Sequence, residues 1–150
     1  MKSNDSTSSS FSSFDEALTL LQCEFVAERN RVNPQGITWL QYDILFALRD
    51  GACLPSMLSK RLGIARSKLS KNLGTLKSLG YVEQMPGVGD RRELQTTLSH
   101  AGMTFMHDVD RQHQELADAA RSVWSGSEQS QFEELSQRLV DALRKNRVAQ

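Results

Sequence analysis

The sequence predicts a single, mainly α-helical domain with one small β-hairpin. Its 150 residues suit one compact domain, and its 39% hydrophobic and 24% charged residues are ordinary globular usage. Apolar residues recur at three- and four-residue steps along most of the chain, which is the period of a helix packed on one side. Only residues 81–98 resemble two short strands with a turn between them, so the β part is small.

The first residues, Met1 to Ser13, contain seven serines and no apolar segment. This composition predicts a disordered tail over residues 1–12 and argues against a secretory signal peptide. No apolar run reaches the roughly 18 residues that span a membrane. We therefore expect a cytoplasmic protein whose single folded domain covers residues 13–150.

Two capping boxes predict where the first two helices begin. The box Ser13–Glu16 opens a helix that runs to about Arg31. The box Thr38–Gln41 opens a second helix, which Gly51 ends. A proline and a glycine in segment 33–36 separate the two. The apolar stripes are Phe14, Leu18, Leu21 and Phe25 in the first helix and Leu40, Ile44, Leu45 and Leu48 in the second.

Two shorter helices follow at the spacing of a helix-turn-helix. Pro55 suits the first position of a helix that Gly63 ends after about two turns. A turn of about three residues follows. Leucines at positions 69, 73, 76 and 79 then form a second apolar stripe, which stops at Gly80.

A β-wing is predicted directly after this unit. Residues 81–85 and 93–98 are typical of two short strands. The segment 86–92 between them contains one proline and two glycines, which favours a hairpin tip. Residues 38–98 are therefore expected to form a winged helix-turn-helix.

Two long helices are predicted to complete the domain. Ser99 caps a helix from about His100 to Trp124, and the capping box Ser125–Glu128 opens the last helix. At about 1.5 Å per residue they extend well beyond a two-turn core. Their apolar stripes need a partner, so we expect residues 13–36 and 100–147 to be dimerisation helices. The stripes are Val109, Leu116, Ala120 and Val123, then Phe132, Leu135, Leu139 and Leu143.

Charge is distributed unevenly along a chain whose formal net charge is zero. Residues 54–98 carry eight basic and three acidic side chains, a net charge of +5, and the remainder carries −5. A basic middle segment indicates a surface that binds a polyanion such as DNA.

The order of these elements, together with three motifs, resembles the MarR family of winged-helix transcriptional regulators. The motifs are Gly80-Tyr81-Val82, Gly89-Asp90-Arg91-Arg92 and Leu98-Ser99-x-x-Gly102. They are similar to the family's glycine after the recognition helix, its Asp-x-Arg wing and its Leu-Thr-x-x-Gly entry to helix five. The chain departs from the family in having Ser99 for threonine and Ala65 for a capping residue. It also places Gly74 inside the recognition helix, at a cost of roughly 1 kcal/mol in helix propensity.

In the predicted recognition helix, polar side chains lie off the leucine stripe and therefore point away from the core. Arg and Lys can bind guanine or phosphate, Asn can pair with adenine, and Ser can donate to phosphates or bases. The predicted DNA contacts are Arg66, Ser67, Lys68, Ser70, Lys71 and Asn72. The resemblance singles out Ser67, Lys68, Ser70 and Lys71 among them.

The resemblance also implies roles for the wing tip. It implies that Arg92 enters the minor groove, where a narrow groove concentrates negative potential. Asp90 is expected to hold the neighbouring basic side chains in place. For Arg91, a phosphate contact and an ordinary exposed charge are equally compatible with the sequence.

The function that follows is a homodimeric, sequence-specific DNA-binding regulator, in the family's default a repressor of pseudo-palindromic promoter sites. Family members release DNA when a small, often aromatic molecule binds between the dimerising helices and the winged helix. Trp39, Tyr42 and Phe46 on the second helix lie near where that ligand would bind. Aromatic residues at such positions also serve as core or interface.

Two alternative functions depend on other features. Cys23 on the first helix resembles the reactive cysteine of the family's organic-peroxide sensors, which would make the protein a thiol-based sensor of oxidative stress. Its short spacing to Thr38 and the nearby Glu24 and Glu28 favour a buried, inert cysteine instead. A winged helix used only for protein contact or dimerisation is the other alternative, and the +5 segment argues against it.

Enzymatic and metal-binding motifs are missing from the sequence. There is no G-x-S-x-G, P-loop or H-E-x-x-H. His100, His107 and His113 are spaced by seven and six residues, so no two occupy chelating i, i+4 positions. Cys23 and Cys53 are too few for a disulfide scaffold. We expect no enzyme activity, metal or cofactor.

Overall fold

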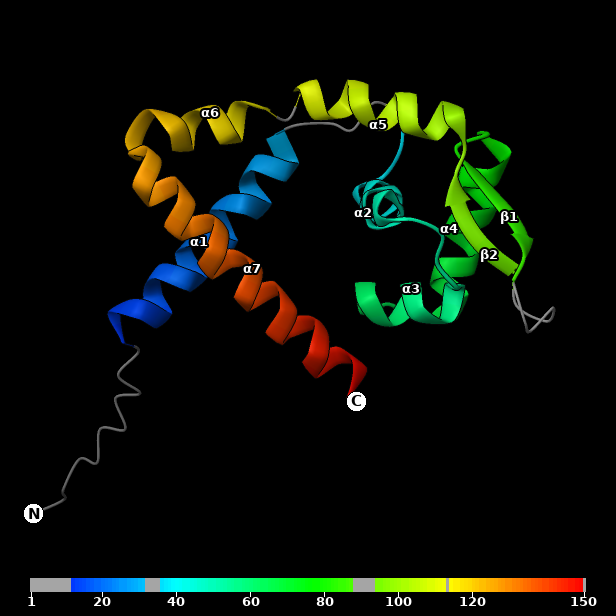
Figure 1. Ribbon diagram of the computed structural model, residues 1–150, viewed down its shortest axis with the longest axis horizontal. Helices are drawn as coiled ribbons and strands as arrows, with labels where there is room; N and C mark the ends of the chain where they lie inside the picture. Colours follow the sequence, from blue (N-terminus) through cyan, green and yellow to red (C-terminus); the bar gives the residue numbers. More distant parts are fainter. Residues whose placement is uncertain (1–11, 32–35, 88–93, 113, 150) are drawn as a thin grey trace, which may run out of the picture. The chain divides into compact units, whose positions relative to one another are not determined.

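The computed structural model describes residues 12–31, 36–87, 94–112 and 114–149 of the chain. It divides into two compact units, residues 1–33 and 34–150. The predicted fold class is confirmed, because the described residues form helices and one two-stranded antiparallel sheet (Figure 1).

Helix α1 (Ser13–Arg31) belongs to the first unit. Its cap differs by one residue from the predicted Ser13–Glu16 box. The Ser12 amide donates to the Asp15 carboxylate (3.0 Å), and the Asp15 amide donates to the Ser12 hydroxyl (3.2 Å). Aspartate reaches back over the first turn as glutamate does in the usual box. No residue of this helix is buried, and Phe14 is 68% exposed.

Helix α2 (Trp39–Ala47) opens the second unit and continues into the 3-10 helix η1 (Leu48–Asp50). The predicted Thr38–Gln41 capping box is present. The Thr38 amide donates to Gln41 Oε1 (3.0 Å), and the Gln41 amide donates to Thr38 Oγ1 (3.2 Å). The capping box therefore sets the first residue of the helix, and Ile44 and Leu45 further along it are buried.

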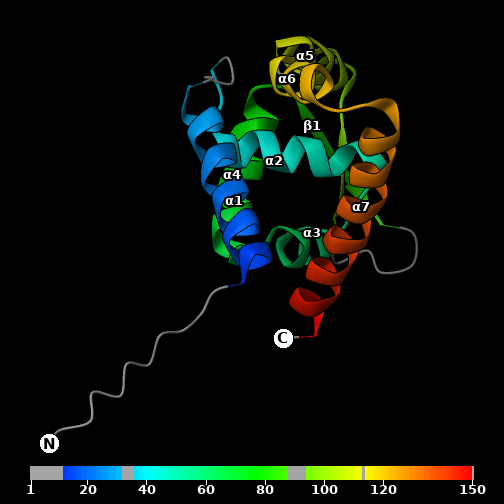
Figure 2. The ribbon, with the colours of Figure 1, turned by 90° about the vertical axis from the view of Figure 1, so that its left-hand side faces the viewer.

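Helices α3 (Pro55–Leu62) and α4 (Arg66–Ser78) form the predicted helix-turn-helix. Gly63 ends α3 in the left-handed conformation, with φ of 66° and ψ of 36°, which a glycine adopts without steric cost. Both helices pack against α2, and α3 runs across the direction of α2 in both ribbon views (Figures 1 and 2). The turn therefore lets α2, α3 and α4 pack together as a three-helix core.

Strands β1 (Val82–Pro86) and β2 (Leu94–Leu98) form the hairpin, with Gln84 opposite Thr96. Cys53 pairs with Thr96 as an isolated bridge. Its amide donates to the Thr96 carbonyl, and the Thr96 amide donates back to Cys53, both at 2.9 Å. No sequence pattern predicts this extra pairing, because a single bridged residue has no periodicity to detect.

The motif from residues 98 to 102 forms a tight joint between α4, the wing and α5 (His100–Gln112). Ser99 Oγ accepts from the Gly102 amide (2.9 Å) and donates to the Gly80 carbonyl (2.5 Å). A Cβ on Gly102 would lie 2.1 Å from the Tyr81 carbonyl oxygen. Glycine is required there because the backbones approach too closely for any side chain.

The segment 100–124, predicted as one helix, is helical over α5 and over α6 (Gln114–Val123), and residue 113 alone separates the two. Met106 and Val109 of α5 are buried, whereas no residue of α6 is buried. The apolar periodicity is the same in both helices, so it could not predict that only α5 has buried residues. His113 lies outside the described residues.

Helix α7 (Gly126–Val148) begins with the predicted capping box. The Ser125 amide donates to Glu128 Oε2 (2.7 Å), and the Glu128 amide donates to Ser125 Oγ (3.3 Å). The rings of Trp124 and Phe132, 4.7 Å apart, pack at the turn between α6 and α7. No residue of α7 is buried, so its apolar stripe remains exposed.

The hydrophobic core lies mostly within the winged helix, and Met106 of α5 contributes to it. It contains Ile37, Ile44, Leu45, Ala47, Leu48, Leu58, Leu69, Leu73, Leu76, Val82 and Met106. Tyr81 and Phe105, whose rings stack 4.5 Å apart, pack beside it. This core gives α4 a fixed support.

Candidate nucleic-acid interface

The orientation of α4 follows from its leucines. Leu69, Leu73 and Leu76 are buried in the core. The side of α4 opposite the core must therefore face outward. Five of the predicted contact residues are exposed on α4: Arg66, Ser67, Lys68, Ser70 and Lys71.

The exposed side of the helix-turn-helix is strongly cationic. Residues 55–78 contain six basic side chains and no acidic one. Among the described residues, no carboxylate lies within ion-pair distance of Lys68 or Lys71. Their charges are therefore available to an external anion.

Arg61 is basic but has a structural task. Its guanidinium donates to Asp50 Oδ2 (2.6 Å) and to the Ala47 carbonyl (3.2 Å), which ties α3 to the end of α2. This hydrogen bond and the adjacent positive charge lower the pKa of Asp50. Arg61 therefore contributes less to the cationic surface than its neighbours on α4.

The N-terminus of α4 has no side-chain cap. Ala65 occupies the N-cap position and makes no capping hydrogen bond, as its methyl side chain requires. The first backbone amides of α4 are left without the partner that Thr38 and Ser125 provide in α2 and α7. Such amides favour an anion near the helix end.

Asn72 differs from the other predicted contacts because it is half-buried. Its Nδ2 donates to the Lys68 carbonyl (2.8 Å), and its Oδ1 accepts from Gln41 Nε2 (3.3 Å). The amide thus connects α4 to α2. Recognition of adenine by Asn72 stays a prediction. It would require the Asn72 amide to break these two hydrogen bonds and bond to the base instead.

The predicted wing-tip residues Asp90, Arg91 and Arg92 lie outside the described residues. The two strands that lead to the tip are described, and β1 packs beside α4.

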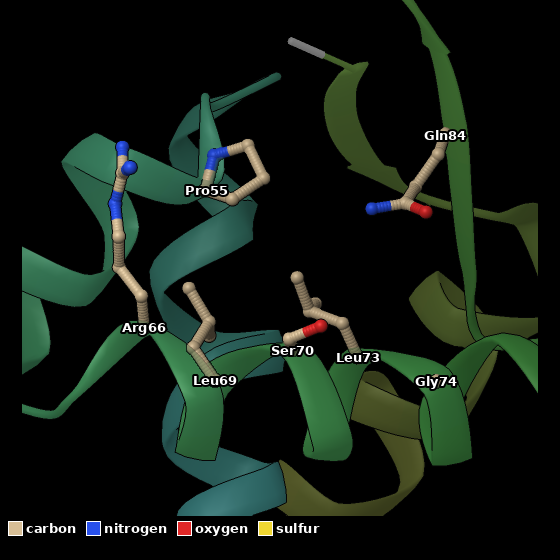
Figure 3. Close-up of a pocket in the computed structure, with 7 residues that line it drawn as sticks. All are labelled: Pro55, Arg66, Leu69, Ser70, Leu73, Gly74 and Gln84. Atoms are coloured by element: carbon tan, nitrogen blue, oxygen red, sulfur yellow. The ribbon is translucent and has the colours of Figure 1, made fainter.

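A groove runs between α4 and β1 (Figure 3). Leu69 and Leu73 line its inner side, while Gln84 extends from β1 toward α4. The other lining residues are Pro55, Arg66, Ser70 and Gly74. Pro55, Gly74 and Gln84 are not among the contacts predicted from the sequence, although a glycine inside a helix is a signal that could have indicated Gly74.

The three predicted ligand residues form an aromatic row along α2. The Trp39 and Tyr42 rings meet edge to face at 5.5 Å, and the Tyr42 and Phe46 rings stack at 6.0 Å. Arg49 lies over the Phe46 ring, 5.2 Å from its centroid, and forms an ion pair with Asp110 of α5. The structure thus connects this row, through a cation, to α5.

Cys23 is exposed on α1, so the expectation of a buried cysteine was wrong for this chain. The reason is that α1 buries none of its residues. Cys53 is half-buried, and its thiol donates to the Leu54 carbonyl at 3.5 Å.

The described part of the chain has neither a metal-binding cluster nor a membrane-spanning helix. No three His, Cys, Asp or Glu side chains gather there closely enough to hold a metal ion. No described helix is both long and apolar enough to cross a membrane.

A three-helix core, an exposed cationic second helix and an adjoining hairpin define a winged helix-turn-helix protein. Comparisons with known proteins agree. The profile described as the MarR family matches residues 35–93. The transcriptional regulator PecS from Dickeya dadantii strain 3937 is 31% identical over 111 residues, covering 71% of this chain and 67% of PecS. The chain therefore belongs to the MarR family.

Solved structures show the same fold. NadR in complex with 4-hydroxyphenylacetate matches with a TM-score of 0.75 and 21% identity, covering 89% of this chain and 96% of NadR. A MarR mutant from E. coli complexed with operator DNA matches with a TM-score of 0.60 and 22% identity, covering 86% and 99% of the two chains.

Proposed function

We propose that the protein is a homodimeric regulator of transcription that binds double-stranded DNA sequence-specifically through α4. The observation that carries this proposal is the cationic face of α4. Lys68 and Lys71 are exposed and have no carboxylate partner among the described residues, while the leucines opposite them anchor the helix. A rigid helix with this face suits the major groove, which admits an α-helix.

Exposed apolar faces support the homodimer. In α7, Phe132, Leu135, Leu139 and Leu143 recur at helical spacing and are each at least 39% exposed. The described helices α1 and α6 likewise bury no residue. A second copy of the chain can cover such faces with identical ones.

Dimerisation determines the kind of DNA site. Two recognition helices related by a twofold axis suit half-sites about one helical turn, roughly 34–36 Å, apart. The operator is then a pseudo-palindrome, and a dimer seated on a promoter represses by blocking it. Such a regulator works beside the chromosome in the cytoplasm and needs no catalytic activity.

Salt dependence tests DNA binding directly. The affinity for a fluorescein-labelled duplex, followed by anisotropy, should fall steeply with salt, because each neutralised phosphate releases counterions. Lys68→Gln should lower the slope of log affinity against log salt by about 1. Lys145→Gln on α7 is the matched control and should leave the slope unchanged. Absence of binding in dilute salt would favour the protein-contact alternative.

The aromatic row supports a second element, release of DNA by a small aromatic acid. Phe46 is 47% exposed, and the adjacent Arg49 carries the charge that a carboxylate would bind. Such a ligand would stack on Phe46 and compete with Asp110 for Arg49, which loosens the connection between α2 and α5. A ligand shifts the conformation only by its difference in affinity between the two states.

Fluorescence tests the effector proposal. In a Trp124→Phe background, Trp39 is the remaining tryptophan of the two in the chain. Aromatic carboxylates such as 4-hydroxyphenylacetate should change its emission and release bound DNA, and Arg49→Gln should weaken both effects. Equal responses with and without Arg49 would contradict the proposed role of the ion pair.

A further inference from the structure

Gly74 has no explanation within the protein itself. It lies inside α4, where glycine is about 1 kcal/mol less favourable than alanine. A Cβ built on it meets no atom within 4 Å. It is also not among the described glycines with positive φ, so alanine fits its backbone. Neither packing nor conformation requires this glycine.

Its position connects it to the groove between α4 and β1. Arg66, Ser70 and Gly74 are spaced four residues apart, so they follow one side of α4, and this side lines the groove (Figure 3). Gly74 therefore leaves a gap in a wall that otherwise carries a cation and a hydroxyl.

The opposite wall is polar and held in place. Gln84 Nε2 donates to the hydroxyl of the buried Thr96 at 3.2 Å, which restrains its amide beside the groove. The apolar inner side comes from Leu69 and Leu73. Among the described residues, no carboxylate lines the groove. Hydrogen-bond donors over an apolar floor, with no negative charge, suit the phosphates and sugars of a nucleic-acid strand.

We infer that this groove seats one sugar–phosphate strand of the bound duplex and that Gly74 allows the strand to approach α4 closely. The inference rests on the proposed function. When a helix lies in the major groove, the strands that border the groove pass along the two sides of that helix. On the side of β1, the strand enters the space between α4 and Gln84. Ser70 and Gln84 donate to its phosphates there.

A steric series at position 74 tests the seat. The probe is a mixed-sequence duplex of about 30 base pairs, because phosphate contacts are read without sequence. Gly74→Ala should weaken affinity about tenfold, and Gly74→Val should weaken it further. The same Gly74→Ala should raise the melting temperature by about 2–4 °C, because alanine favours the helix. Gly126→Ala at the start of α7, which also meets open space, is the control and should not change affinity.

Charge provides an independent second arm. Gln84→Glu keeps the side-chain shape but adds a negative charge to the seat. Its carboxylate can accept from the Thr96 hydroxyl, which in the wild type accepts from the Gln84 amide. It should weaken affinity at least tenfold at low salt. Gln95→Glu makes the same charge change on the other face of the hairpin, since Gln95 pairs with Met85 rather than with Gln84. It should have a clearly smaller effect.

The outcomes separate this inference from the proposed function. If the wild-type protein does not bind duplex DNA in dilute salt, the proposed function fails. If it binds but the Gly74 variants bind equally well, the seat is wrong and the proposed function stands. Equal losses in Gly74→Ala and Gly74→Val would also overturn the seat, because they would indicate lost helix flexibility rather than a steric limit.

Discussion

The winged helix and the terminal helices carry apolar residues at the same helical spacing but bury them very differently. In α4, Leu69, Leu73 and Leu76 are at most 4% exposed. In α7, Leu135, Leu139 and Leu143 are between 45% and 59% exposed. The same pattern thus serves a core in one region and a surface in the other. The winged helix has its own core, whereas α1, α6 and α7 bury no residue within the single chain.

The largest expected effects compare these two regions directly. Leu58→Ala, at a fully buried site, should lower the free energy of unfolding by about 3 kcal/mol. Leu135→Ala should act instead through self-association, so its effect should depend on protein concentration. Urea unfolding at two protein concentrations measures the change in stability, and sedimentation measures self-association. A concentration-independent loss in Leu135→Ala would contradict the proposed dimer face.

The joint at Gly102 is the next most sensitive site. Gly102→Ala should destabilise the fold by about 2–3 kcal/mol, because the new Cβ meets the Tyr81 backbone, which cannot rotate away. Thermal unfolding measures the loss. Gly126→Ala, a helical glycine in open space, is the control and should not destabilise the protein. Equal stability of the two variants would show that the joint is looser than described.

The uncapped start of α4 separates stability from binding. Ala65→Ser and Ala65→Asp should each stabilise the protein by about 1 kcal/mol by capping the helix. Ala65→Asp should also weaken DNA affinity, because it places a negative charge beside the cationic face. Thermal unfolding and anisotropy measure the two effects. If both variants bind DNA as the wild type does, the α4 terminus lies away from the phosphates.

The smallest expected effect concerns pH and the α7 cap. The Ser125 amide and hydroxyl, which hydrogen-bond to Glu128, lower the pKa of its carboxyl below the ordinary 4.5. A lowered pKa contributes stability above the unfolded value, and this is lost as pH falls through the folded value. Glu128→Gln should therefore make the free energy of unfolding depend less on pH in that acid range, as urea unfolding at several pH values would measure. In a Ser125→Ala background, Glu128→Gln should change it much less.

The sequence alone determined the features whose signals are local. The Thr38 and Ser125 caps, the glycine ends of α3 and α4 and the leucine stripe of α4 each depend on residues within one or two turns, so reading them in order was sufficient. The cap of α1 shifted by one residue, to Ser12 and Asp15, since adjacent serines offer equivalent hydroxyls. Because the leucine stripe of α4 is such a local signal, the outward side of α4 was predicted correctly, except at Asn72, which is half-buried and hydrogen-bonds to Gln41 of α2.

Tertiary structure decided what depends on residues distant in the sequence. The Cys53–Thr96 bridge, the contact that requires Gly102, and the groove joining Gly74 to Gln84 each bring together segments whose spacing carries no period. Whether an apolar stripe becomes core or surface was likewise settled only by what packs against it. Local hydrogen bonding and periodicity determine a helix and its faces, whereas the neighbours of each face depend on the path of the whole chain.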